Sequence, residues 1–129
     1  MKNWTELQEM DYIEEISRVA DIFYVSYKRA PSDFKIEVRE YANGDYIGIA
    51  NYQIWGPQQA TPYISLHVQN SVEKALNDAI NGIKMFDNKE IPNKLLFFVS
   101  TENDSIIYDG NGCLVTMEEV NKRRNEIKS

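Results

Sequence analysis

The sequence contains one cysteine, Cys113, and one histidine, His67. A single cysteine excludes an intramolecular disulfide, and a reducing cytoplasm is the compartment that this composition predicts. Structural zinc sites need several cysteines and histidines at set spacings, so no metal site is predicted. His67 falls on the polar side of a predicted strand, where it is either an ordinary half-exposed histidine or a general base.

Basic residues are also scarce, because 14 Lys and Arg stand against 20 Asp and Glu, for a net charge of -6. Long nucleic acid is not an expected partner, since binding it requires a basic face that displaces condensed counterions. A small anionic ligand needs only one or two positioned cations and is compatible with this charge. No apolar run has the roughly 20 residues that cross a bilayer, and the N-terminal residues lack the apolar core of a secretory signal.

The motifs of common enzymes are missing as well. No G-x-S-x-G, H-E-x-x-H or dinucleotide-binding fingerprint occurs. The glycine-rich residues 109–112, DGNG, have neither the spaced oxygen ligands of a calcium loop nor a Walker lysine. The sequence therefore predicts a protein that is not an enzyme, with no catalytic residue and no cofactor.

Apolar spacing predicts a long N-terminal helix over residues 5–29, opened by a capping box of Thr5 and Gln8. A helix with so aromatic a stripe makes self-association a reasonable hypothesis. The alternative is a strand over residues 22–27, because IFYVSY is rich in β-branched and aromatic residues. The positions that recur at spacings of three and four are Ile13, Ile16, Ala20, Phe23 and Tyr27.

The remaining elements alternate between strands and helices. Residues 34–41 and 45–55 read as a hairpin turned at Asn43-Gly44, followed by a strand over 63–69 and a helix from Ser71. A buried strand over 95–99 and a hairpin of residues 106–108 and 113–115 precede a last helix, capped by Thr116 and ending near residue 128. The predicted fold is α+β: one domain over residues 1–129 with a mostly antiparallel sheet, an N-terminal helix, a central covering helix and a C-terminal helix.

Residues 51–63, NYQIWGPQQATPY, have an unusual composition for a connection between strands. Surface turns rarely carry tryptophan and tyrosine, whereas aromatic faces stack on flat ligands and glutamine amides bind their polar edges. The segment therefore predicts a pocket wall for a base or a similar planar molecule. The alternative is a bent pair of strands whose aromatic residues complete the core.

A cluster of cations, Lys122, Arg123 and Arg124, lies in the last predicted helix of this acidic chain. Arginine binds phosphate through two parallel hydrogen bonds and stacks on bases, so Arg123 and Arg124 are candidates to bind an anion. Cations near the C-terminus of a helix also interact favourably with its dipole, which explains them without any ligand.

Residues 51–63, the helix SVEKALNDAINGI and the arginine-bearing C-terminal helix together resemble the phage anti-Thoeris sponge family over about residues 34–128. Members of that family are small non-enzymatic oligomers that sequester cyclic ADP-ribose type signals of bacterial Thoeris defence. The resemblance implies that aromatic residues, matched here by Phe97 and Phe98, hold the base. It also implies that arginine and asparagine of the C-terminal helix, matched by residues 123–125, hold phosphates between subunits. The long N-terminal helix departs from the family pattern.

A second resemblance suggests another class of function. The order of NGDYIGI, a strand and SVEKALNDAINGI is similar to the sheet-then-helix order of HicB-type antitoxins, which bind a toxin through the sheet. The leading hypothesis is a homo-oligomeric cytoplasmic sponge for a cyclic nucleotide immune signal, and the alternative is an antitoxin or immunity-type inhibitor of a basic partner. The predicted ligand-binding residues are Trp55, Gln59, Thr61, Tyr63, Phe97, Phe98, Arg123, Arg124 and Asn125.

Overall fold

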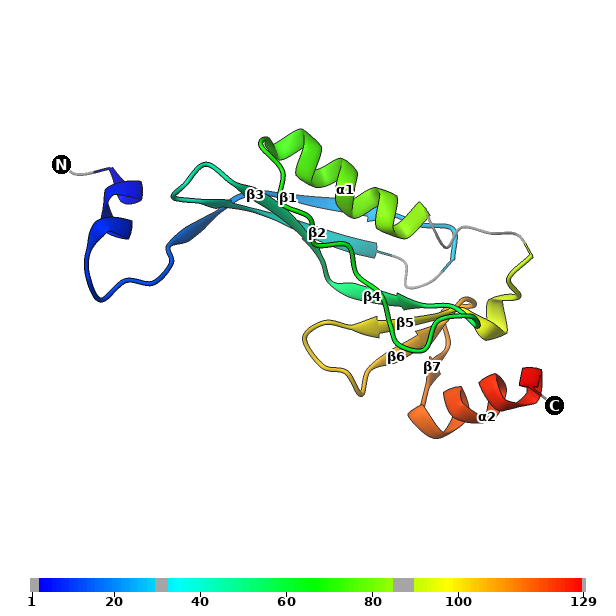
Figure 1. Ribbon diagram of the computed structural model, residues 1–129. Coiled ribbons are helices and arrows are strands. Elements are labelled where there is room, and N and C mark those ends of the chain that lie inside the picture. Colours follow the sequence, from blue (N-terminus) through cyan, green and yellow to red (C-terminus); the bar gives the residue numbers. More distant parts are fainter. Residues whose placement is uncertain (1–2, 30–32, 85–89, 129) are drawn as a thin grey trace.

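The computed structural model describes residues 3–29, 33–84 and 90–128, and it confirms an α+β fold with antiparallel pairing throughout its sheets. One sheet has the strand order β1-β2-β3 and the other has the order β4-β5-β6-β7. Figure 1 shows α1 over the first sheet and α2 beside the second. The elements are η1 (Trp4–Glu9), β1 (Ser17–Ser26), β2 (Asp33–Tyr41), β3 (Tyr46–Ala50), β4 (Tyr52–Trp55), α1 (Val72–Lys84), η2 (Asn93–Leu95), β5 (Phe97–Ser100), β6 (Ile107–Asp109), β7 (Leu114–Val115) and α2 (Met117–Lys128).

The hairpin of β2 and β3 forms where the sequence predicts it. Gly44 has φ +92°, which glycine adopts without steric penalty, and the Asn43 carboxamide accepts a hydrogen bond from the Asp45 N–H. Phe34, Ile36 and Val38 alternate along β2 with charged residues and are fully buried toward α1.

The chain passes from one sheet into the other at Asn51, so the predicted strand over residues 45–55 is divided into β3 and β4. Asn51 exchanges hydrogen bonds with the Lys35 backbone of β2 through its N–H and its side-chain oxygen, both at 3.0 Å. Its carbonyl oxygen accepts the N–H of Thr101, which follows β5, at 2.9 Å. One residue thus ties the two sheets together.

The prediction of a long N-terminal helix is wrong beyond its first turns. Only η1 is helical, and it is a six-residue 3-10 helix without a side-chain cap, so the Thr5 and Gln8 capping box is also wrong. The Gln8 side chain instead accepts the N–H of Ile16 and donates to the carbonyl of Glu14. Residues 17–26 form β1, so the alternative prediction of a strand over residues 22–27 is right for residues 22–26. Pairing with β2 and β-branched side chains outweigh the helical spacing.

Helix α1 packs closely on β3 through small residues. A Cβ built on Gly48 would lie 2.4 Å from the Ala75 carbonyl oxygen, so only glycine allows this approach. Ser71 caps the helix through its hydroxyl, which accepts the Lys74 N–H at 3.2 Å. The covering helix is confirmed.

Strand β5 separates two cores. Its alternate side chains point in opposite directions, so Phe98 joins the core under α1 and the first sheet, whereas Phe97 and Val99 join a second core with Val120 of α2. The prediction of a buried central strand is confirmed, because β5 pairs with β4 on one side and β6 on the other.

Residues 63–69 are extended but make only two isolated bridges, Tyr63 to Ile54 and Gln69 to Tyr46, so the predicted strand is only partly formed. The alternation of its side chains is real. Ser65 and His67 face α1 and bond to Asp78, and Leu66 and Val68 therefore point away from the helix and are exposed.

Candidate functional site

The structure brings together three of the predicted site residues, Trp55, Gln59 and Arg124. The guanidinium carbon of Arg124 lies 4.5 Å from the centroid of the Trp55 ring, the geometry of a cation–π contact. Terminal nitrogens of the same guanidinium donate hydrogen bonds to the carbonyl oxygens of Gly56, at 2.8 Å, and Gln59. We call these three side chains and the Gly56 carbonyl the Trp55–Arg124 cluster.

The turn after β4 is shaped by its own side chains. The Gln59 side-chain oxygen accepts the Gly56 N–H at 2.7 Å, and the Trp55 indole N–H donates to the Gln59 carbonyl at 3.0 Å. Gln59 therefore presents two oxygens inward, and α2 approaches the turn through Arg124. Burial lowers the pKa of Arg124, because desolvation disfavours its charged form.

Trp55 is 8% exposed, so its ring cannot stack on a ligand in this conformation. The ring packs against the guanidinium of Arg124, and Arg124 is the more exposed of the two side chains. Trp55 belongs to the second core, and Tyr52 and Tyr63 pack against the first, as the alternative interpretation of residues 51–63 predicted. The ring of Trp55 and the guanidinium of Arg124 contact each other.

Arg123 points elsewhere and forms ion pairs with carboxylates. It lies 2.9 Å from the Asp109 carboxylate and 3.0 Å from that of Glu119, and it also donates to the Lys94 carbonyl. Burial alone would raise the pKa of Asp109, but hydrogen bonds from Arg123 and from the N–H groups of Cys113 and Asn111 outweigh it and hold the pKa below its usual range. Arg123 thus links α2 to β6 and to η2.

The other predicted site residues do not gather around the cluster. Phe97 and Phe98 are 0% exposed and point into different cores, so neither is accessible to a ligand in this conformation. Thr61 and Asn125 are exposed, and Tyr63 is half-buried where it bridges to Ile54.

A polar group that the sequence reading missed joins residues 63–69 to α1. The Asp78 carboxylate accepts the Ser65 hydroxyl at 2.9 Å and the His67 N–H at 3.2 Å, and it lies 2.9 Å from Nδ1 of His67. Burial alone would raise the pKa of Asp78, but the bonds from His67 and Ser65 outweigh it and lower the pKa.

The Ser65 hydroxyl and Nδ1 of the His67 ring both contact Oδ1 of Asp78. The same hydroxyl lies 3.1 Å from Nδ1 of His67, the ring nitrogen that faces Asp78. A hydrolase triad instead needs serine on the opposite ring nitrogen, so this group fastens the segment and does not activate a nucleophile. Eleven positions separate His67 from Asp78. A signal of pairing over that distance is absent from the sequence pattern.

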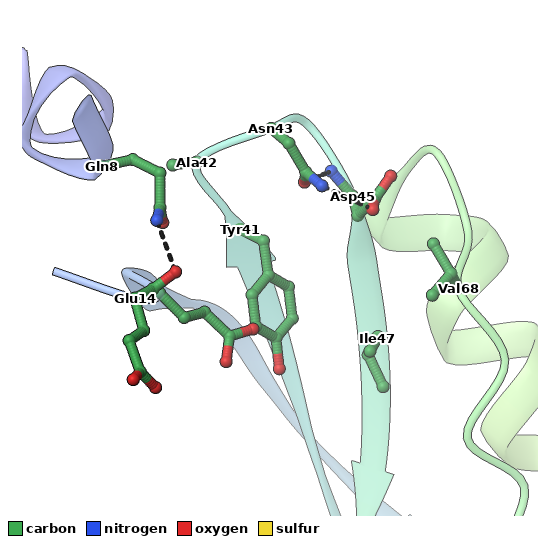
Figure 2. Close-up of a pocket in the computed structure, with 9 residues that line it drawn as sticks. Gln8, Glu14, Tyr41, Ala42, Asn43, Asp45, Ile47 and Val68 are labelled. Carbon is green, nitrogen blue, oxygen red and sulfur yellow. Dashed lines mark hydrogen bonds between the residues drawn. The ribbon is translucent and has the colours of Figure 1, made fainter. Parts of the chain in front are cut away.

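A groove of about 580 Å³ lies between the β2–β3 turn and the N-terminal residues Gln8, Glu14 and Glu15. Figure 2 shows Tyr41, Asp45 and Ile47 on the hairpin side, with Val68 next to Ile47 and Glu14 across from Tyr41. Its lining includes three carboxylates, from Glu14, Glu15 and Asp45, and the apolar side chains of Ile47 and Val68. None of the residues of the Trp55–Arg124 cluster lines it.

Searches of protein-family models, curated proteins and solved structures find no match to this chain. Within residues 3–29, 33–84 and 90–128, no helix has the length and apolar character needed to cross a membrane. The same residues contain no group of three or more His, Cys, Asp or Glu side chains placed to bind a metal ion.

Proposed function

We propose that this protein is a non-enzymatic sponge that binds a small anionic nucleotide of the cyclic ADP-ribose type and keeps it intact. The observation that supports the proposal is the Trp55–Arg124 cluster, which joins the amide-rich turn to the arginine helix although 68 positions separate Gly56 from Arg124. The resemblance to anti-Thoeris sponges supplies the class of ligand, and blocking bacterial anti-phage defence in the cytoplasm is the role that this class implies.

The cluster suits a phosphorylated planar ligand for a physical reason. Arginine has five N–H donors, and the bonds to Gly56 and Gln59 occupy one on each terminal nitrogen. The other donors are suited to phosphate oxygens, and the guanidinium face opposite Trp55 is suited to stacking on a base. Because these bonds already fix the orientation of the guanidinium, Arg124 loses little conformational entropy when the ligand binds.

The test measures the melting temperature of the purified protein with cyclic ADP-ribose isomers and, separately, cyclic dinucleotides, followed by recovery of the ligand after heating. A ligand at a hundredfold excess over its dissociation constant adds about 2.7 kcal/mol to the free energy of unfolding. We expect stabilisation and an unchanged ligand. The absence of a shift with every nucleotide would contradict the proposal, and recovery of a hydrolysed product would indicate an enzyme.

Two substitutions on α2 assign the effect to the cluster. Arg124→Lys keeps the positive charge but removes the planar guanidinium. We expect the dissociation constant of the ligand to rise tenfold or more, which is a loss of about 1.4 kcal/mol in binding free energy. Lys122→Ala removes an exposed cation from the same helix and should leave binding unchanged. Equal losses in both variants would point to overall charge and not to this cluster.

The groove favours a second candidate, the inhibitor of a basic protein partner. Glu14, Glu15 and Asp45 line it, and these carboxylates are complementary to lysine and arginine side chains. Binding should then weaken with salt and with the double reversal Glu14→Lys and Glu15→Lys, measured against a stoichiometric partner identified by pull-down. If the charge-reversed variant still binds that partner, the groove is not the binding site.

A further inference from the structure

The face of the first sheet opposite α1 has exposed apolar side chains in the part of the chain that the structure describes. On the side opposite α1, the strands present Val19, Ile22 and Tyr24 from β1 and Ile47 and Ile49 from β3. Tyr24 is 72% exposed. We call this surface, together with the β2 residues Lys35, Glu37 and Arg39 and with Leu66 and Val68, the open face.

Residues 63–69 extend the open face, and their polar and apolar side chains point the opposite way from those of an ordinary solvated sheet. In a solvated sheet the polar residues point outward and the apolar residues inward. Here Ser65 and His67 turn toward α1, whereas Leu66 and Val68 point outward and are 51% and 57% exposed. Contiguous exposed apolar side chains of this kind mark an interaction surface.

Two neighbouring rows of the open face run across the strands of the first sheet. Arg39 of β2 stands between Val19 and Ile47 in one row, and Glu37 stands between Ile22 and Ile49 in the next. Each row therefore has a charge at its centre and apolar residues on both sides. The two central charges are opposite in sign, and they pair within the chain at 2.8 Å.

This arrangement is self-complementary. A twofold axis that runs across the strands between the two rows would place Arg39 of one copy over Glu37 of the other, and the reverse. The same rotation places Val19 on Ile22 and Ile47 on Ile49, so apolar side chains meet apolar side chains. Arg39 and Glu37 therefore each meet an opposite charge, and Lys35 lies in an outer row with Tyr24, outside these cross-pairs.

Growth of the sheet along its free edge is disfavoured by comparison. The pairing of β1 with β2 shifts register between Val19 and Asp21, and the Asp21 carboxylate accepts the N–H of Ile22 at 2.9 Å. A bulge and a carboxylate at the edge are devices that block pairing with another strand. The rows of the open face carry no such device, and the face lies between Thr101 and Glu102 beside Ile49 and the N-terminal residues beside Ile47.

We propose that a second copy of this chain docks on the open face and forms a twofold dimer of stacked sheets. Strands β1, β2 and β3 have ten, nine and five residues, and residues 63–69 add a fourth extended segment. At about 4.8 Å between segments and about 3.3 Å per residue, the face covers roughly 490 Å². Two such faces bury about 980 Å², which is close to the roughly 1,000 Å² expected of a specific interface. The inference gives the oligomer of the proposed function a surface, but it does not require nucleotide binding.

The test is sedimentation equilibrium of the full chain over a range of concentrations. The wild type should show twice the 15.0 kDa chain mass, and added salt should strengthen the dimer because each copy carries a net charge of -6. The double substitution Leu66→Lys and Val68→Lys should raise the dissociation constant tenfold or more. The matched control is Leu114→Lys, which changes a 67% exposed leucine of β7 and should leave the dimer intact.

A charge exchange tests the twofold arrangement itself. Glu37→Arg alone places like charges opposite each other and should weaken the dimer, whereas Glu37→Arg combined with Arg39→Glu restores both cross-pairs and should recover it. Should the double lysine variant misfold, Tyr24→Lys on β1 tests the other half of the face. A wild type that stays monomeric, or a dimer that survives the substitutions on the open face, would overturn the inference. A monomer that still retains nucleotide would leave the proposed function intact.

Discussion

The two sheets of this protein differ in how their faces are covered. Sheet β4-β5-β6-β7 has buried side chains on both faces of β5, with Phe98 on one side and Phe97 on the other. Sheet β1-β2-β3 packs against α1 on one face and leaves apolar side chains exposed on the other. Both sheets therefore contribute to buried cores, and only the first sheet has a face on which we propose that a second copy docks.

The largest effect is expected in the enclosed sheet. Phe98→Ala removes a fully buried ring that packs edge-to-face on Phe34 at a centroid distance of 5.6 Å. We expect a loss of about 4 kcal/mol in the free energy of unfolding, measured by urea denaturation. A loss below about 1 kcal/mol would contradict the enclosed environment of β5.

The link between α2 and the enclosed sheet should rank next. Arg123→Met keeps the length of the side chain but leaves the Asp109 carboxylate, whose side chain is 4% exposed, without its cation. We expect a loss of about 3 kcal/mol, because an unpaired buried charge is strongly destabilising. The double substitution Arg123→Met and Asp109→Asn should recover part of that loss in the same denaturation assay.

The packing of α1 on the half-covered sheet can be tested with two glycines. Gly48→Ala places a methyl group against the Ala75 backbone and should cost about 2 kcal/mol by forcing α1 away from β3. Gly44→Ala meets no atom within 4 Å and carries only the strain of its positive φ, about 1 kcal/mol. Thermal unfolding of both variants should therefore show the larger loss at Gly48.

Acid should weaken the enclosed sheet through Asp109. Because its pKa is lowered in the folded state, the stabilisation is complete above about pH 4, the pKa range of an unfolded aspartate, and is lost as the pH falls through the lowered value. Asp109→Asn should flatten this acid-side decline in the free energy of unfolding. An equally steep decline in the variant would assign the acid sensitivity to other carboxylates.

The smallest effect is expected on the open face. Val19→Thr changes a side chain that is 45% exposed, so the stability of the dilute chain should change by less than about 0.5 kcal/mol. The same substitution should reduce stability more at high protein concentration if the face is buried between copies. Chemical denaturation at two concentrations measures both values.

Local patterns in the sequence were sufficient for the elements whose burial follows one period. The β2–β3 turn at Asn43-Gly44, helix α1 and the buried strand β5 all follow from such patterns. The N-terminal segment did not, because apolar residues at helical spacing were also β-branched and aromatic, and pairing with β2 decided between the two. Propensity alone cannot weigh a tertiary contact of that kind.

The candidate site was predictable in part. The composition of residues 51–63 and the cations of α2 marked Trp55 and Arg124 separately, and the structure joins them. The engagement of Arg123 by Asp109 and the tie between His67 and Asp78 depend on how distant segments pack, which no spacing in the chain encodes. The reversed polarity of residues 65–68 became visible only once the position of α1 was known.

The carboxylate at the edge of β1 has a consequence for the solution behaviour of this protein. With the Ile22 amide engaged by Asp21, the proposed pair of stacked sheets would be a closed assembly that does not grow beyond two copies. Asp21→Ala would free that amide beside exposed valine, isoleucine and tyrosine, and we expect concentrated samples of the variant to become turbid and to form ribbons. The Asp21 side chain would then be what prevents this protein from aggregating through the edge of β1.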